Sequence, residues 1–115
     1  MKEISRNELK QLIDSKGSYL LIDVREMNEM VHGKIPTAQN LPLSEFTAAL
    51  ELSEEEFQKK YSFSMSKRDR IIFYCRSGSR SAKATEAATD KGFNAENYKG
   101  SILDWAEIDE QVEKY

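Results

Sequence analysis

The residues best suited to chemistry surround the only cysteine of the chain. Cys75 comes directly after the apolar run 71–74 and is followed by small and basic residues: Arg76, Ser77, Gly78, Ser79, Arg80 and Ser81. The apolar run is typical of a buried strand, and the residues from 82 onward are typical of a helix. A thiol between a strand end and a helix N-terminus, beside two arginines, is stabilised as the thiolate. We therefore predict that Cys75 is a nucleophile rather than a small buried core residue.

The loop after Cys75 also carries groups that would hold an anion. Its backbone amides would form an anion-binding concavity if they curled around the sulfur, and Gly78 allows the dihedral angles of such a turn. Arg76 and Arg80 offer N–H donors to an oxyanion such as thiosulfate. Three hydroxyls could donate to the thiolate: those of Ser77, Ser79 and Ser81. For Ser81 we favour a second interpretation, in which its side chain caps the following helix.

Two other kinds of site receive less support from the sequence. His32 is the only histidine and could act as a base toward Cys75, but a single histidine in a polar segment is usually an ordinary surface residue. One cysteine and one histidine without close spacing do not supply a typical set of metal ligands. We expect no metal and no cofactor.

The Cys75 loop needs a scaffold that brings strand ends together. The predicted strands are residues 19–24, 71–74 and 95–98. Pro36 and Pro42 bracket a further short extended piece. Strands that alternate with helices predict an α/β fold with a mostly parallel central sheet flanked by helices. Sites in such sheets form outside the carboxyl ends of the strands, so we expect Asp23, Arg25 and Cys75 to lie near one another.

Capping residues predict where the helices begin and end. Two segments have the spacing of a capping box: residues 5–8 and 53–56. Two glycines are expected to end helices: Gly17 and Gly92. Ser44 is expected to cap a helix that runs through Leu50. The segment 25–34 is expected to be a short helix or a loop, and the last helix is expected to span 102–112.

Length and charge limit the classes of protein to consider. A chain of 115 residues is expected to be one domain, residues 1–115, with a single core. The net charge of −3 argues against binding to nucleic acid through general electrostatics. No segment approaches the ~18 apolar residues of a membrane span, so no membrane partner is expected. No apolar stripe exceeds the needs of a core, so a monomer is expected.

The cysteine count and the N-terminus bear on the cellular compartment. One cysteine cannot form an intramolecular disulfide, and a reactive lone thiol suits a reducing compartment. Residues 1–5 lack the apolar core of a signal peptide and carry an acid early, unlike a mitochondrial presequence. We expect a cytoplasmic protein, with the mitochondrial matrix as the alternative if a presequence has been removed.

Four blocks of the chain, taken in order, resemble a known family. They are Leu21-Ile22-Asp23-Val24-Arg25-Glu26; Gly33-Lys34-Ile35-Pro36 with Asn40-Leu41-Pro42; Cys75-Arg76-Ser77-Gly78-Ser79-Arg80-Ser81; and Tyr98-Lys99-Gly100 through Trp105. Together they resemble a single-domain rhodanese (thiosulfate sulfurtransferase) over residues 4–107. The resemblance is greatest to the small eukaryotic rhodaneses that pass sulfur to glutathione.

This resemblance implies a rhodanese-like three-layer fold and sulfurtransferase activity. In the family, the loop cysteine attacks the outer sulfur of thiosulfate, releases sulfite and becomes a persulfide. Carried over by position, Cys75 carries the persulfide, and the donor is bound by Arg76, Ser77, Gly78, Ser79 and Arg80. Asp23 and Arg25 match an ion pair that supports the site, as Ser81 would. With no second cysteine, the acceptor must be external: glutathione, thioredoxin or, in vitro, cyanide.

The chain departs from the family's pattern at two positions. Thr37 stands where the family commonly has glycine, so the turn at 36–38 is expected to avoid a glycine-only conformation. Ser101 stands where a second glycine is common, and it is expected to be the N-cap of the last helix.

Three other functions remain possible on the sequence. A phosphatase or arsenate reductase of the Cys-x5-Arg type needs an arginine six positions after the cysteine; Ser81 stands there, and Arg80 comes one residue early. A non-catalytic rhodanese-like module would usually have lost the cysteine that this chain keeps. A persulfide relay to a protein or to a thiolation pathway stays open, because surface shape selects donor and acceptor.

Overall fold

A parallel four-stranded sheet forms the centre of the computed structural model, which describes residues 1–115. The strands are β1 (Leu20–Asp23), β2 (Gln39–Asn40), β3 (Arg70–Tyr74) and β4 (Asn94–Asn97), in the spatial order β2-β1-β3-β4. All neighbouring pairs are parallel, and Asp23 at the end of β1 is in register with Tyr74 at the end of β3. The carboxyl ends of the two central strands therefore meet at one edge, as predicted.

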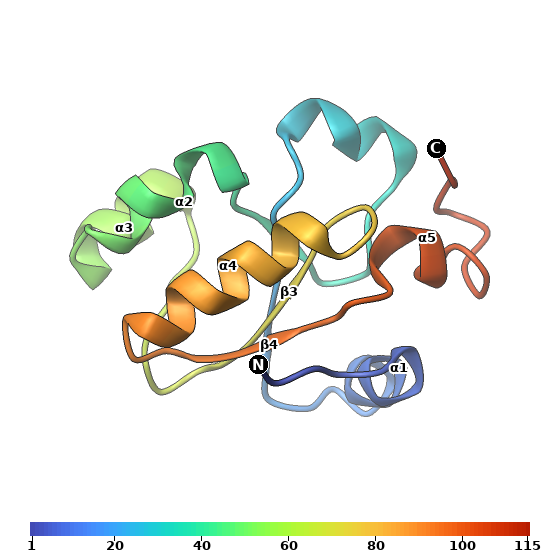
Figure 1. Ribbon diagram of the computed structural model, residues 1–115, viewed down its shortest axis with the longest axis horizontal. Coiled ribbons are helices and arrows are strands. Elements are labelled where there is room, and N and C mark those ends of the chain that lie inside the picture. Colours follow the sequence, from blue (N-terminus) through green and yellow to red (C-terminus); the bar gives the residue numbers. More distant parts are fainter.

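Helices cover both faces of the sheet, which gives the three-layer α/β architecture (Figure 1). The helices are α1 (Arg6–Asp14), the 3-10 helix η1 (Met27–His32), α2 (Leu43–Leu50), α3 (Glu54–Tyr61), α4 (Ser79–Asp90) and α5 (Ser101–Trp105). Helices α2, α3 and α4 pack on one face, whereas α1 and α5 pack on the other. No helix is long and apolar enough to cross a membrane.

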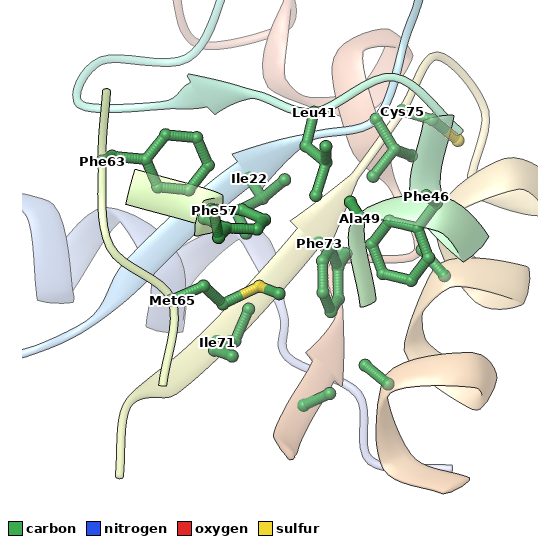
Figure 2. Close-up of a cluster of buried hydrophobic side chains, with 14 residues drawn as sticks. Ile22, Leu41, Phe46, Ala49, Phe57, Phe63, Met65, Ile71, Phe73 and Cys75 are labelled. Atoms are coloured by element: carbon green, nitrogen blue, oxygen red, sulfur yellow. The ribbon is translucent and has the colours of Figure 1, made fainter. Parts of the chain in front are cut away.

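The two central strands, β1 and β3, contribute side chains to two separate apolar cores. Successive side chains of a strand point to opposite faces, so Ile71 and Phe73 enter the core under α2–α4 while Ile72 and Tyr74 enter the core under α1 and α5. Figure 2 shows the first of these cores, which extends as far as Cys75. Because β3 is buried on both faces, its sequence is a continuous apolar run and does not alternate between apolar and polar residues.

Several helix ends agree with the sequence predictions. Both capping boxes form: Ser5 with Glu8 starts α1, and Ser53 with Glu56 starts α3. Gly92 follows α4 with φ of +92°, the left-handed conformation that ends a helix at a glycine.

Other helix ends differ from the predictions. At the end of α1, Lys16 and not Gly17 adopts the left-handed conformation. Gly17 contributes only a hydrogen bond that closes the last turn, from its N–H to Leu12 O at 2.9 Å. Ser44 does not cap α2. Pro42 occupies the N-cap, and Leu43 N–H donates to Val24 O, directly after β1, so the helix starts before Ser44.

The last helix is shorter than predicted. Helix α5 ends at Trp105, and the chain continues in turns to Tyr115. The side chain of Asp109 accepts hydrogen bonds from Trp105 Nε1 at 3.0 Å and from Gln111 N–H at 2.9 Å. Aspartate that binds nearby N–H groups in this way favours a turn over a helix interior.

The expectation for the turn at Thr37 was wrong. Thr37 has φ of +75°, the left-handed region that favours glycine. Ala38 N–H donates to Ile35 O at 3.2 Å, which closes a turn with Pro36 at its second position and Thr37 at its third. A turn of this kind requires positive φ at the third position. The Thr37 hydroxyl is hydrogen-bonded to Tyr19 Oη at 2.9 Å, which helps to hold a threonine at this positive φ.

Candidate active site

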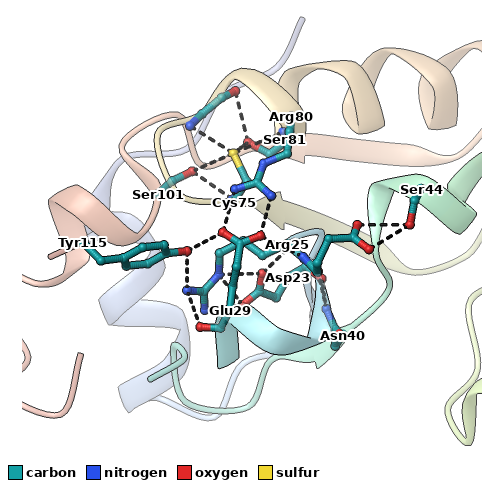
Figure 3. A network of polar contacts seen from close by, with 12 residues as sticks. Asp23, Arg25, Glu29, Asn40, Ser44, Cys75, Arg80, Ser81, Ser101 and Tyr115 are labelled. Atoms are coloured by element: carbon teal, nitrogen blue, oxygen red, sulfur yellow. Dashed lines mark hydrogen bonds and ion pairs between the residues drawn. The ribbon is translucent and has the colours of Figure 1, made fainter. Parts of the chain in front are cut away.

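The thiol of Cys75 lies in a cradle of hydrogen-bond donors at the carboxyl end of β3 (Figure 3). Gly78 N–H and Ser81 N–H donate to Cys75 Sγ at 3.1 and 3.4 Å. The hydroxyls of Ser81 and Ser101 lie 3.4 and 3.9 Å from the same sulfur. Cys75 itself is only 1% exposed. The sulfur therefore meets backbone amides and hydroxyls rather than water.

These donors determine the acidity of the thiol. Burial alone raises the pKa of Cys75, because desolvation disfavours the thiolate. The hydrogen bonds from Ser81, Gly78 and Ser101 act in the opposite direction and outweigh burial, so the pKa of Cys75 falls below its ordinary value. The N-terminus of α4 adds partial positive charge at the same point. The cradle stabilises a thiolate without a neighbouring base.

The cradle depends on the backbone conformation of Gly78. This residue has φ of +99°, and a Cβ added here would lie 2.3 Å from Lys99 O. No side chain fits that space, and L-residues rarely adopt this φ. The loop therefore turns toward the sulfur only because position 78 is a glycine.

Ser81 binds the sulfur and does not cap helix α4. The N-cap is Gly78, and Ser81 is the third residue of the helix. Its hydroxyl donates to Gly78 O at 3.2 Å and contacts Cys75 Sγ, and the side chain is fully buried. Of the two interpretations of this residue, the favoured one was wrong.

Ser101 is a residue of the cradle that the sequence predictions missed. It is the first residue of α5, with Gly100 at the N-cap position, so it is not the predicted cap. Its hydroxyl accepts a hydrogen bond from Cys75 N–H at 3.1 Å and donates to Tyr98 O at 2.9 Å. Its φ is +54°, which turns the side chain toward the β3 end. The only signal in the sequence was its place in a block that resembles the family.

The two loop arginines have different surroundings. The two terminal guanidinium nitrogens of Arg80, Nη1 and Nη2, donate to the carboxylate of Glu29 at 2.6 and 3.0 Å. These hydrogen bonds hold the pKa of Glu29 at about 2. Arg76 has no carboxylate partner, and its guanidinium carbon lies 4.8 Å from the ring centroid of Tyr115. Ser77 and Ser79 lie on the exposed side of the loop.

Asp23 and Arg25 form a buried ion pair beside this loop. Arg25 Nη2 lies 2.7 Å from Asp23 Oδ2, and both side chains are at most 1% exposed. The remaining guanidinium donors bind Gly33 O at 2.8 Å and Tyr115 Oη at 3.1 Å. Asn40 Nδ2 donates to the backbone carbonyl oxygens of Asp23 and Arg25, at 2.9 and 2.8 Å. The pair fixes the end of β1 against η1 and does not hydrogen-bond to Cys75 Sγ.

The remaining candidate, His32, does not act on the thiol. Its Nδ1 pairs with Glu113 at 3.2 Å, and its ring stacks on Tyr115. No hydrogen bond joins it to Cys75. Nor does any group of three or more His, Cys, Asp or Glu side chains lie close enough to hold a metal ion. The chemistry of the site therefore rests on the thiol, amides, hydroxyls and arginines.

Comparison with known proteins agrees with this geometry. Residues 5–108 match the Rhodanese-like domain family. The human thiosulfate:glutathione sulfurtransferase is 37% identical over 107 residues, which cover 90% of this chain and 92% of the human protein. The Saccharomyces cerevisiae protein named thiosulfate sulfurtransferase RDL2, mitochondrial, is 39% identical over 102 residues, which cover 87% of this chain and 66% of the yeast protein. The structure of the human single-domain sulfurtransferase TSTD1 superposes with a TM-score of 0.87 at 35% identity, covering 95% of this chain and 98% of that one.

Proposed function

Because the chain belongs to the rhodanese-like domain family, we propose that it is a sulfurtransferase that moves sulfane sulfur from thiosulfate to a thiol through a persulfide on Cys75. The observation that carries this proposal is the cradle of amides and hydroxyls around Cys75 Sγ, which lowers the pKa of a buried thiol. The names of the relatives support the same class of reaction.

The proposed first half-reaction uses the thiolate as the nucleophile. Cys75 Sγ attacks the outer sulfur of thiosulfate, a new S–S bond forms, and the S–S bond of thiosulfate breaks. The electron pair of that bond leaves with sulfite. The terminal sulfur of the persulfide that remains lies one S–S bond, about 2.05 Å, beyond Sγ, so its negative charge is close to donors of the same cradle, such as Gly78 N–H.

The donor's oxygens need cationic partners, and the loop offers two. Arg76 has no carboxylate partner, so its N–H groups are free to bind a sulfonate. Arg80 is engaged by Glu29 but adds positive charge at the same edge. We assign the exposed Ser77 and Ser79, with Gly78, to the same donor-binding loop. Asp23 and Arg25 are assigned a supporting role.

The second half-reaction requires an external thiol, because the chain has no other cysteine. The acceptor thiolate attacks the terminal sulfur of the persulfide, and Cys75 leaves as the thiolate. The name of the human relative favours glutathione, and thioredoxin is the alternative. The yeast relative is named as mitochondrial, which supports the matrix as the alternative to our cytoplasmic prediction.

The cradle is less suited to phosphate chemistry. A Cys-x5-Arg enzyme would place a guanidinium where this chain has Ser81, and the buried Ser81 hydroxyl contacts Cys75 Sγ directly. A cradle that closes on one sulfur atom leaves no arginine fork for a tetrahedral oxyanion at that point.

Intact mass spectrometry tests the proposal. Incubation with thiosulfate should release one sulfite per chain and add one sulfur atom to the protein, and glutathione should then remove that sulfur. Cys75→Ser should abolish both events while its thermal unfolding stays close to that of the wild type, since Ser is nearly isosteric. Ser18→Ala, at an exposed hydroxyl before β1 and away from the Cys75 loop, is the matched control and should keep the added sulfur. An unchanged mass after thiosulfate, or aryl-phosphate hydrolysis faster than sulfur transfer, would contradict the proposal.

A further inference from the structure

The last ten residues, 106–115, fold back beside the Cys75 loop and bring Tyr115 into the site (Figure 3). Glu113 N–H donates to His32 O at 2.9 Å, and the Tyr115 ring stacks on the His32 ring with centroids 4.0 Å apart. Tyr115 is thus fixed against η1 from one side. Its other side faces the arginines of the site.

The hydroxyl of Tyr115 connects the two ion pairs of the site. It accepts a hydrogen bond from Arg25 Nη1 at 3.1 Å and donates one to Glu29 Oε2 at 2.6 Å. Glu29 in turn holds Arg80 through both of its carboxylate oxygens. The carboxylate that orients Arg80 is therefore itself oriented by Tyr115.

The ring of Tyr115 supports the other loop arginine. The guanidinium carbon of Arg76 lies 4.8 Å from the ring centroid, within the range of a cation–π contact. Arg76 has no salt bridge, and its Nε is buried without a hydrogen-bond partner. The contact with the aromatic ring is therefore the specific interaction that orients this guanidinium.

We propose that Tyr115 is a positioning residue of the active site, which presents Arg76 through its ring and Arg80 through Glu29 to an anionic reagent at Cys75. This deepens the proposed function and rests on it for the identity of the natural donor. Tyr115 touches neither the sulfur nor the reacting bond. Its role is to keep two guanidinium groups aimed at the mouth of the cradle, where the oxygens of a sulfur donor would bind.

Alkylation of Cys75 tests the positioning separately from sulfur transfer. Iodoacetate and iodoacetamide both react by the same displacement, in which Sγ forms a bond to carbon and iodide leaves, but only iodoacetate carries a negative charge. The ratio of the two second-order rates therefore measures how well the site's cations meet an anion. In Tyr115→Leu this ratio should fall about fivefold, since the loss of a cation–π contact is worth about that factor. The iodoacetamide rate should stay within about twofold of the wild type, because the cradle donors are unchanged.

Two further variants separate the ring from a general loss of stability. Tyr115→Phe keeps the ring and loses only the hydroxyl, with its hydrogen bonds to Glu29 and Arg25, so its ratio should lie between the wild-type and Tyr115→Leu values. Tyr19→Leu removes a tyrosine of comparable exposure at the opposite edge of the sheet, where its hydroxyl binds Thr37. This control should keep the wild-type ratio. The thiosulfate KM of Tyr115→Leu should rise by the same factor as the ratio falls, with kcat changed less.

The outcomes distinguish the two proposals. A wild-type ratio and KM in both Tyr115 variants would overturn the positioning role. If Tyr115→Leu failed to fold in a thermal melt, Tyr115→Phe would decide alone, and an unchanged ratio there would overturn the proposal. If the wild type transferred no sulfur from thiosulfate while Tyr115→Leu still lost its preference for iodoacetate, the positioning role would stand and the proposed function would fail.

Discussion

Two buried regions meet at Cys75, and different interactions hold them together. On one side is the apolar core under α2–α4, whose 14 buried residues include Ile71, Phe73 and Cys75 itself (Figure 2). On the other side are the segments that follow β1 and β3, where buried side chains such as Arg25 and Ser81 are held by hydrogen bonds (Figure 3). The core excludes water by packing, whereas the loop replaces water by specific donors.

This difference implies different tolerance to substitution. Apolar burial has no direction, so a core position accepts another side chain of similar volume. A hydrogen bond requires a donor at one place, so the loop accepts very little change even where the volume is kept. We therefore expect core substitutions to reduce stability and loop substitutions to reduce reactivity.

The largest effect on stability is expected at Phe73. This side chain is fully buried and meets Phe46 edge to face, with ring centroids 5.3 Å apart. Phe73→Ala should lower the free energy of unfolding by about 3–5 kcal/mol, through lost burial and the cavity left behind. Urea denaturation measures this, with Met65→Leu as the volume-conserving control, which should cost less than about 1.5 kcal/mol. At temperatures where Phe73→Ala remains folded, Cys75 should keep its reactivity. If reactivity were lost with the fold intact, the two regions would not be separable.

An intermediate effect is expected from a matched pair of glycines. Gly78 and Gly92 both have positive φ, of +99° and +92°. A Cβ would lie 2.3 Å from Lys99 O at the first, but 3.7 Å from the flexible Lys67 side chain at the second. Gly92→Ala should therefore cost only backbone strain, about 1 kcal/mol, with unchanged thiol reactivity. Gly78→Ala should cost more and should slow alkylation of Cys75, because its amide must move away from the sulfur. Equal losses of stability and of alkylation rate in the two variants would show that positive φ alone, and not the contact with Lys99 O, determines the cost of the substitution.

The smallest effect is expected from removing one hydroxyl of the cradle. The pKa of Cys75 lies below its ordinary value of 9.0, so the iodoacetamide rate of the wild type should reach its plateau at a lower pH than that of a free thiol. Ser81→Ala removes the hydroxyl whose hydrogen bond to Sγ lowers the pKa of Cys75 but keeps the Ser81 backbone amide, so the midpoint should move to higher pH. Ser79→Ala, at an exposed hydroxyl of the same loop, should leave the midpoint unchanged. A midpoint that did not move in Ser81→Ala would assign the acidity to the backbone amides and Ser101.

Local patterns in the sequence were sufficient for the strands, two capping boxes and the reactive loop. Each is set by residues within a few positions of one another, such as Ser5 with Glu8, and the strand before Cys75 is marked by its apolar run. The rhodanese-like fold followed from the order of these blocks. Lys16 and Thr37 show where local rules failed, because tertiary contacts and turn closure placed non-glycine residues at positive φ.

The rest of the candidate site depends on contacts between distant segments. Ser101 lies 26 positions after Cys75, and Tyr115 lies 90 positions after Arg25, yet each contributes a hydrogen bond to the site. Glu29 reaches Arg80 only because η1 folds over the Cys75 loop. No periodicity or spacing in one sequence links such residues, since their meeting is decided by how α5 and the last turns pack.

The same long-range assembly makes the single thiol a reporter of folding. Its acidity requires that β3, the first turn of α4 and the start of α5 all be in place, because the donors to Cys75 Sγ come from Gly78, Ser81 and Ser101. An unfolded or partly docked chain would carry the same cysteine with the reactivity of a free peptide thiol. Since no second cysteine competes for the reagent, the rate of thiol labelling after dilution from denaturant would record, in one signal, when the native packing of this edge is complete.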